Sequence, residues 1–217
     1  MPTDDLWVHE KALTRQGYDI IAGIDEAGRG PLAGPVVSAA VVLPPDFDSR
    51  EINDSKKLTP RQRDRQFDRI YHEAAAIGIG IVDALEIDRI NILQASKLAM
   101  ALAVENLTPR PQYLLIDGNF TIPCNLPQQS LVKGDSRCVS IAAASIVAKV
   151  SRDRLMQRYH DDYPQFGFDR HKGYPTAPHK AAIAAHGPCP IHRTSFRGVR
   201  EFLPCPSAIQ SGSHARG

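Results

Sequence analysis

Continuous apolar runs alternate along this chain with segments whose apolar residues recur every three to four positions. Runs rich in β-branched residues predict buried strands, and the longer period predicts amphipathic helices. The expected strands are 20–24, 36–43, 77–82, 113–116 and 131–132. The expected helices are 60–76, 88–107, about 138–160 and a short one from Pro178 to about Ala185, preceded by a short arm or helix over 1–17. This order predicts an α/β fold with a mixed central sheet and helices on both faces.

Two features indicate where the elements and the domain end. Thr59 precedes Pro60, a typical helix start, and Ser136 is the expected N-cap of the helix at 138–160. The length of 217 residues predicts one domain, with two small lobes as the alternative. The segment 206–217 has no apolar period and is expected to be a mobile tail.

Composition narrows the class of protein. No apolar run is long enough to span a bilayer, and the N-terminus lacks the basic start and apolar stretch of a signal peptide. A cytoplasmic location without membrane contact is therefore expected. The four cysteines are scattered, so a disulfide framework is not expected. A zinc site around Cys189 is disfavoured, because fewer than four ligands lie close together.

Charge is unevenly distributed although the net charge is only +2. Residues 130–217 hold 13 Lys and Arg against 6 Asp and Glu, whereas residues 1–129 hold 13 against 18. A basic C-terminal part fits a polyanionic substrate. Charges that merely decorate exposed helix faces are the competing interpretation.

Four carboxylates stand where apolar runs give way to glycine-containing turns: Asp25, Glu26, Asp117 and Asp135. A carboxylate at the end of a core strand is costly to bury without a cation or a hydrogen-bond donor. Oxygen ligands of this kind suit Mg²⁺ or Mn²⁺. Individually, the Asp117 and Asp135 segments also read as ordinary turns. The coincidence of three acid-bearing strand ends favours a metal site.

Glycines around Arg29 resemble a dinucleotide-binding loop only superficially. That fingerprint requires a following helix, whereas Pro31, Pro35 and a β-branched run follow here. The alternative is a main-chain platform over Gly28–Gly30 that approaches a ligand closely, with Arg29 reaching a phosphate.

Two further loops carry candidate substrate contacts. The segment 53–57 contains Asn53, Ser55 and Lys56 and is either a phosphate clamp or a solvated linker. In the segment 171–176, Tyr174 stands between glycine and proline. Its ring either stacks on a sugar or base, or packs over the edge of the core.

Taken together, these segments resemble the ribonuclease HII family of bacteria in order from about residue 20 to 200. The motifs are Gly23-Ile-Asp25-Glu26-Ala-Gly28-Arg29-Gly30-Pro-Leu-Ala-Gly34-Pro, Asn53-Asp-Ser-Lys-Lys57, Ile116-Asp117-Gly118, Lys133-Gly-Asp135, Ala142-Ala-Ala-Ser145-Ile-Val-Ala-Lys149 and His171-Lys-Gly-Tyr174-Pro-Thr176. The resemblance implies one catalytic domain of ribonuclease H-like fold over 1–205, with a helical and loop portion at about 160–205.

The resemblance also implies an activity and roles for residues. The activity is endonucleolytic cleavage of RNA in RNA–DNA hybrids and cleavage 5′ of single ribonucleotides in duplex DNA, leaving 3′-hydroxyl and 5′-phosphate ends. Two Mn²⁺ or Mg²⁺ ions would be held by the four acids. Gly28, Arg29 and Gly30 would sense the ribose 2′-hydroxyl, and Tyr174 would stack at the RNA-to-DNA junction. Asn53, Ser55, Lys56, Lys133, Ser145 and Lys149 are further expected substrate contacts.

Two other functions remain as alternatives. A non-catalytic, metal-dependent nucleic-acid-binding module would use the basic C-terminal part and Tyr174 equally well. A metal-dependent phosphatase acting on small substrates would use the acids but would be indifferent to duplex structure. The sequence shows no protein-docking motif, so protein partners and oligomeric state are left open.

Overall fold

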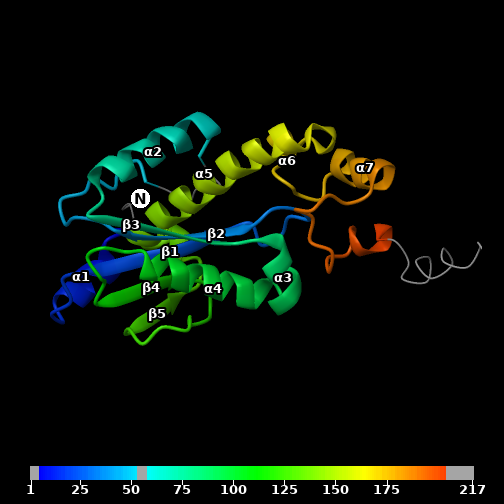
Figure 1. Ribbon diagram of the computed structural model, residues 1–217. Coiled ribbons are helices and arrows are strands. Elements are labelled where there is room, and N and C mark those ends of the chain that lie inside the picture. Colours follow the sequence, from blue (N-terminus) through cyan, green and yellow to red (C-terminus); the bar gives the residue numbers. More distant parts are fainter. Residues whose placement is uncertain (1–4, 53–57, 204–217) are drawn as a thin grey trace, which may run out of the picture.

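The computed structural model describes residues 5–52 and 58–203. Five strands form one mixed sheet: β1 (Ile21–Ala27), β2 (Val36–Val42), β3 (Ala76–Val82), β4 (Tyr113–Asp117) and β5 (Gln128–Leu131). Their order is β3-β2-β1-β4-β5 (Figure 1). The pairs β1–β2 and β2–β3 are antiparallel, whereas β1–β4 and β4–β5 are parallel. The carboxyl ends of β1, β4 and β5 therefore meet at one end of the sheet.

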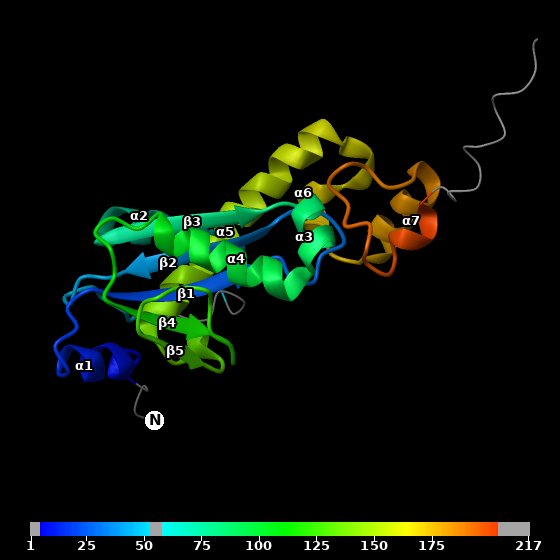
Figure 2. The same ribbon diagram turned by 60° about the horizontal axis from the view of Figure 1, so that its bottom comes forward.

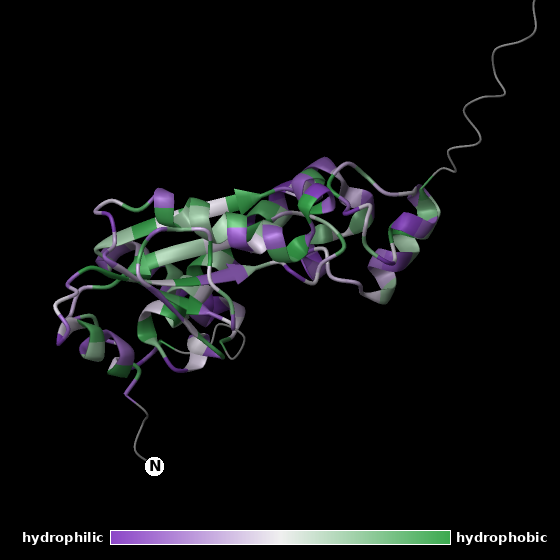
Figure 3. Cartoon of the chain, turned by 90° about the horizontal axis from the view of Figure 1, so that it is seen from below, coloured by the Kyte–Doolittle hydropathy of each residue, from purple (hydrophilic) through white to green (hydrophobic). Residues whose placement is uncertain are grey.

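Helices cover both faces of this sheet, as predicted (Figures 1 and 2). Ala39 and Val41 of β2 pack with α5 (Val139–Asp162) and α2 (Pro60–Glu73) on one face. Ala40 and Val42 pack with α4 (Ile92–Glu105) on the other. Hydrophobic colouring runs through the strands, while the helices carry both colours (Figure 3). The remaining helices are α1 (Val8–Thr14), α3 (Ala84–Ile90), α6 (Phe168–His171) and α7 (Ala177–His186), with 3₁₀ turns at Gly134–Ser136, Pro164–Phe166 and Arg200–Phe202.

The structure corrects the single helix expected over 88–107. Asn91 has a positive φ of 69° and separates α3 from α4. Its side chain accepts hydrogen bonds from the N–H groups of Leu93 and Gln94, so it caps α4. Asparagine tolerates this backbone conformation better than most residues, and its carbonyl oxygen satisfies the first amides of the new helix. Apolar spacing alone could not reveal the break.

The start of α5 also differs from the prediction. The Ser136 hydroxyl donates to the Lys133 carbonyl and does not cap the helix. Instead, the buried Glu10 of α1 accepts from the Ser140 N–H at 3.0 Å and from the Ser140 hydroxyl at 2.6 Å. A carboxylate is favourable at the positive end of a helix dipole. The N-terminal helix thus anchors the long central helix.

Glycines allow the helices to approach the sheet very closely. A Cβ atom on Gly23 of β1 would lie 2.1 Å from the main-chain carbon of Ser140 in α5. A Cβ atom on Gly80 of β3 would lie 2.0 Å from the Ala99 carbonyl oxygen in α4. Main-chain atoms cannot move aside as a side chain can, so these positions fix the layer spacing at the centre of the fold.

A second, smaller core lies beyond the far end of α5, where α6 and α7 follow (Figures 1 and 2). Its buried residues are Leu32, Ala33, Met156, Phe166, Phe168, Ile183 and Val199. The β1–β2 connection reaches into it, because Leu32 donates to the Gly173 carbonyl and Gly34 donates to the Ile191 carbonyl. The residues that follow β1 are thereby joined to the C-terminal segments.

Several expectations lie outside what this fold can test. The proposed tail 206–217, together with Asn53, Ser55 and Lys56, falls outside the described residues. The one-domain division over 1–205 stays a prediction.

Cys124, Cys138 and Cys189 are free thiols. None of the helices in the described ranges has the length and apolar composition to cross a bilayer.

We expect Gly23→Ala to lower the free energy of unfolding by about 3 kcal/mol, because its methyl group would press into the backbone of α5. Urea unfolding measures this change. Gly30→Ala is the control, since its Cβ would meet only the Tyr174 ring at 3.7 Å. Equal stability of the two variants would contradict the close-packed interface.

Candidate active site

Three of the expected acids lie at the adjoining ends of two parallel strands. Asp25 and Glu26 stand within the last part of β1, which continues to Ala27, and not beyond its end. Asp117 is the last residue of β4. The β1–β4 register pairs Ile24 with Ile116, so Asp25 and Asp117 occupy the next position on neighbouring strands. The structure therefore brings these two carboxylates together, as predicted.

The ionisation of Asp25 is strongly affected by its surroundings. Its side chain is buried, and this burial raises the pKa of Asp25 well above the ordinary value. The negative charges of Glu26 and Asp117 raise the pKa further. Hydrogen bonds from Ser145 and from the Glu26 N–H, the latter at 2.7 Å, favour the ionised form but do not cancel these effects. Such a site attracts cations.

The fourth acid lies close by in the chain fold. Asp135 is buried in the 3₁₀ turn that follows β5. Its neighbour Gly134 donates its N–H to the Asp117 carboxylate at 2.7 Å. A Cβ atom on Gly134 would lie 3.3 Å from the same carboxylate oxygen. The turn that carries Asp135 is thus fastened directly to Asp117.

The donor set fits a hard divalent metal ion, because it consists of carboxylate oxygens near one buried, cation-attracting position. Across residues 5–52 and 58–203, no three His, Cys, Asp or Glu side chains come together closely enough to hold an ion in this arrangement. The Glu26 carboxylate contacts the Arg29 guanidinium at 3.4 Å. The four-carboxylate cage therefore stays a prediction, and Glu26 would exchange this contact for a metal.

The glycine loop, residues 28–35, lies beside the loop that carries Tyr174. A Cβ atom on Gly30 would lie 3.7 Å from the Tyr174 ring, and that ring is 41% exposed. Arg29 and Gly30 are exposed as well. This exposure favours a ring that is accessible to a ligand over one packed on the edge of the core. Its ring and the main chain at Gly30 face the same space.

The other expected contact residues are placed differently from one another. Lys149 pairs with Asp153 at 2.7 Å, and its ammonium lies 5.9 Å from the centre of the Tyr174 ring. Lys133 is exposed and has a positive φ of 57°. Ser145 is buried and hydrogen-bonds to Asp25, so its position favours support of the acid over direct contact with a ligand.

Sequence reasoning missed an aromatic residue beside the turn that follows Asp117. The Phe120 ring lies against the Asp117-Gly118 turn, where a Gly118 Cβ would be 3.1 Å from it. The Arg29 guanidinium lies 5.9 Å from the ring centre and the Lys97 ammonium 5.5 Å. Cations over an aromatic face are attracted to it. No spacing in the sequence indicated that α4 would bring Lys97 to this place.

Two buried arginines were missed as well. Arg152 donates to the carbonyl oxygens of Pro35, Ala33 and Lys172, and Arg193 donates to those of Gly28, Arg29 and Gly34. The signal for Arg152 was present in the sequence, because helical spacing from Ser145 and Ala148 places it on the inward face of α5. Arg193 lies in an irregular segment and gave no such signal.

A chain of neutral histidines supports the Tyr174 loop. The Cys189 N–H donates to His192 Nδ1, so His192 carries its proton on Nε2, which contacts His179 Nε2 at 3.1 Å. His179 in turn donates from Nδ1 to the Tyr174 carbonyl at 2.9 Å. When both histidines are neutral, every ring nitrogen of the pair therefore has a hydrogen-bond partner.

Solved structures of similar fold define the class of protein to which this arrangement belongs. The ribonuclease H2 from Pyrococcus horikoshii OT3 matches with a TM-score of 0.70 and 29% identity, covering 84% of this chain and 96% of that chain. The fold is therefore ribonuclease H-like, as expected.

Sequence comparison identifies the family. The family model for ribonuclease HII matches residues 22–199. Ribonuclease HII of Geobacter sulfurreducens is 59% identical over 202 residues, covering 93% of each chain. That of Syntrophotalea carbinolica is 57% identical over 194 residues, covering 89% of this chain and 93% of its own. The chain belongs to the ribonuclease HII family, and it is a metal-dependent endoribonuclease that acts on RNA–DNA hybrids.

The histidine chain predicts a dependence of stability on pH. Burial lowers the pKa of His179 and of His192 to about 4, whereas an unfolded histidine titrates near ~6.5. Between these values the unfolded chain binds more protons, so stability should be complete above about pH 6.5 and fall toward pH 4. Thermal unfolding across this range measures the loss. His192→Gln, which cannot titrate, should decline less steeply, and an identical decline would contradict this origin.

Proposed function

We propose that the chain cleaves 5′ of single ribonucleotides embedded in duplex DNA, as well as the RNA strand of hybrids, by a two-metal-ion mechanism. The observation that carries this proposal is the position of Gly30, in the loop that follows Asp25 and Glu26 in the chain, against the exposed Tyr174 ring. A main-chain segment that faces one sugar and an aromatic ring that faces the next are suited to recognising a single ribonucleotide junction. Only the 2′-hydroxyl distinguishes RNA from DNA at one nucleotide.

Asp25, Glu26, Asp117 and Asp135 would hold the two ions, Mn²⁺ or Mg²⁺. When bound, these ions supply an activated water and stabilise the leaving 3′-oxygen. The chain's own part is to fix the carboxylates: the Ser145 hydroxyl and the Glu26 N–H hold Asp25, and the Gly134 N–H holds Asp117. No side chain need act as nucleophile, so the products would be a 3′-hydroxyl and a 5′-phosphate.

Positive groups in the loops and helices around the acids would bind the flanking phosphates. Lys149 lies by Tyr174, and Arg29 and Lys97 lie over Phe120. Lys133 extends this set from the turn before Asp135. Asn53, Ser55 and Lys56 would complete the phosphate contacts, although they lie outside the described residues. A substrate of this kind fits a cytoplasmic enzyme whose catalytic domain spans 1–205.

We expect Asp25→Asn and Asp117→Asn to lower cleavage about 10²–10³-fold, because a lost metal ligand removes several kcal/mol of transition-state stabilisation. The assay follows a duplex with one ribonucleotide in Mn²⁺, in Mg²⁺ and in chelator. Asp68→Asn, an exposed acid on α2, should behave as wild type.

Thermal unfolding provides a second measurement on the same variants. In chelator, Asp25→Asn should raise the Tm by about 2–4 °C, because it removes a charge that Glu26 and Asp117 repel. The variant should also gain less from Mn²⁺ than wild type does. Full activity of Asp25→Asn at limiting metal would contradict the assignment. Binding without cleavage would select a binding module, and turnover of a simple phosphate monoester would select a phosphatase.

We expect Tyr174→Ala to lose about 1–3 kcal/mol of stacking, which is roughly a 5- to 150-fold loss on a lone ribonucleotide and less on a long hybrid. Gly30→Val should have the same selective effect, because its side chain would occupy the space before the ring. Tyr174→Phe keeps the ring and is the matched control. Equal losses on both substrates would refute the junction role.

A further inference from the structure

Among the fully buried side chains of the described ranges, those of Arg152 and Arg193 are the largest. They are 1% and 0% exposed, and both lie beneath the glycine loop. Burying a guanidinium costs several kcal/mol unless its donors are satisfied. Here the acceptors are main-chain carbonyl oxygens of the two loops that face the proposed ribose site. Because these two arginines hold both loops, they are candidates for a role in substrate recognition as well as in packing.

Arg193 closes the glycine loop on itself. One of its terminal nitrogens, Nη1, donates to the Arg29 carbonyl at 3.0 Å, and Nη2 donates to the Gly28 carbonyl. Nε and Nη2 both donate to the Gly34 carbonyl, at 3.0 and 2.9 Å. The same guanidinium therefore ties the beginning of the loop to its end. The Phe196 ring lies 5.1 Å from the guanidinium carbon and covers it.

Arg152 joins the glycine loop to the loop that carries Tyr174. Its Nε and Nη2 donate to the carbonyls of Pro35 and Ala33 at 2.9 and 3.0 Å, and its Nη1 donates to the Lys172 carbonyl at 3.0 Å. A Cβ atom on Gly28 would lie 2.2 Å from Arg152 Nε. Arg152 consequently runs directly below Gly28 and reaches the residue two positions before Tyr174.

The direction of these carbonyl groups also fixes the direction of the neighbouring main-chain N–H groups. In a trans peptide the C=O of one residue and the N–H of the next point in opposite directions. Because the Gly28 and Arg29 carbonyls point inward to Arg193, the N–H groups of Arg29 and Gly30 point away from it. Arg29 and Gly30 are exposed, and a Cβ atom on Gly30 would lie 3.7 Å from the Tyr174 ring, so we infer that these N–H groups open toward the side on which Tyr174 lies. Two successive N–H groups of this kind bind a hydroxyl or phosphate oxygen.

Arginine suits this position better than a neutral donor would. Its planar fork of five N–H groups fixes several carbonyls at once in one geometry. A lysine has the same charge but no planar fork. Replacing the arginine by lysine therefore tests the planar geometry separately from the charge.

We propose that Arg193 and Arg152 are positioning residues that set the spacing between the N–H groups of the glycine loop and the Tyr174 ring, and thereby determine the preference for a lone ribonucleotide. This inference rests on the proposed recognition of the 2′-hydroxyl by the glycine loop. Neither arginine touches the substrate. Each acts through main-chain carbonyls that it holds.

The test compares Arg193→Met and Arg193→Lys with wild type on two substrates: a duplex with one ribonucleotide and a continuous RNA–DNA hybrid. We expect Arg193→Met to lower kcat/KM on the lone ribonucleotide at least tenfold more than on the hybrid. Arg193→Lys should restore only part of this selectivity. Equal losses on both substrates, or full restoration by lysine, would overturn the proposal.

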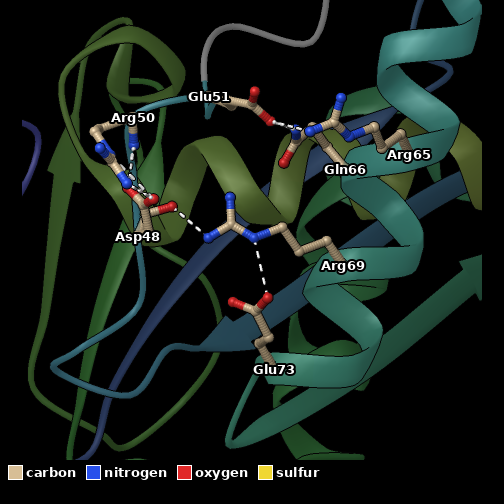
Figure 4. A network of polar contacts seen from close by, with 7 residues as sticks. All are labelled: Asp48, Arg50, Glu51, Arg65, Gln66, Arg69 and Glu73. Atoms are coloured by element: carbon tan, nitrogen blue, oxygen red, sulfur yellow. Dashed lines mark hydrogen bonds and ion pairs between the residues drawn. The ribbon is translucent and has the colours of Figure 1, made fainter.

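Arg69→Met is the matched control for removal of an arginine. Arg69 donates to the Asp48 carbonyl at 2.6 Å and pairs with Glu73 at 3.1 Å on α2, within a polar network that includes none of the four acids (Figure 4). Its loss should change stability without changing the ratio of the two cleavage rates. A change in that ratio equal to that of Arg193→Met would show that the effect is a general consequence of destabilisation.

A binding measurement separates this inference from the proposed function. Fluorescence anisotropy in chelator gives the Kd for the ribonucleotide duplex and for the same duplex made of DNA alone. Wild type should prefer the ribonucleotide duplex, and Arg193→Met should lose that preference even if cleavage 5′ of the ribonucleotide fails in wild type. Retention of the preference by Arg193→Met would overturn the positioning role.

If Arg193→Met does not fold, a milder variant tests the positioning role of Arg193. Phe196→Leu leaves every hydrogen bond of Arg193 in place but removes the ring that covers the guanidinium. We expect a smaller shift of the same sign in both the cleavage ratio and the binding ratio. Unchanged ratios in a folded Phe196→Leu protein together with unchanged ratios in Arg193→Lys would refute the proposal.

Discussion

The burial of Asp25 beside two further carboxylates, which repel its charge, is the constraint on which the rest of this structure depends. Asp25 is held out of water beside Glu26 and Asp117, and each of these charges disfavours the ionised form of Asp25. The fold must supply enough packing energy to keep such an arrangement together. It does so by pressing the alanine-rich α5 onto β1 at Gly23, where no side chain separates the two backbones. The site is thus an energetically costly feature maintained by a closely packed helix–sheet layer.

Opposite charges lie below the neighbouring loop. Arg152 and Arg193 are buried under residues 28–35, a short distance along the chain from Asp25. The carboxylates would bind metal cations. The guanidinium groups orient main-chain N–H donors that would bind a polyanion. A phosphate backbone would be attracted to cations held by the carboxylates and to the main-chain N–H groups of the loop, not to the carboxylates themselves. Histidines that remain neutral by burial support the Tyr174 loop without adding charge there.

Much of the fold followed from the apolar pattern, and the exceptions have physical causes. The five strands and the helices at 60–76 and 138–160 were predicted within a few residues. The helix at 88–107 was wrong because Asn91 adopts a positive φ and caps a new helix with its side chain. The N-cap at Ser136 was wrong because Glu10, which is 130 positions from Ser140 in the chain, accepts from the Ser140 N–H at the start of α5 instead. Local propensity cannot register a competitor that arrives through tertiary contact.

The sequence by itself determined the family, the order of elements and which carboxylates stand at strand ends, because apolar periodicity and motif spacing are local properties of the chain. Only the tertiary structure decided that Ser145 contacts Asp25, that Phe120 lies under Arg29 and Lys97, and that Arg193 holds the carbonyls of Gly28 and Arg29. These contacts join segments up to 165 residues apart. They depend on the strand register and on the path of irregular loops, which no short-range pattern encodes.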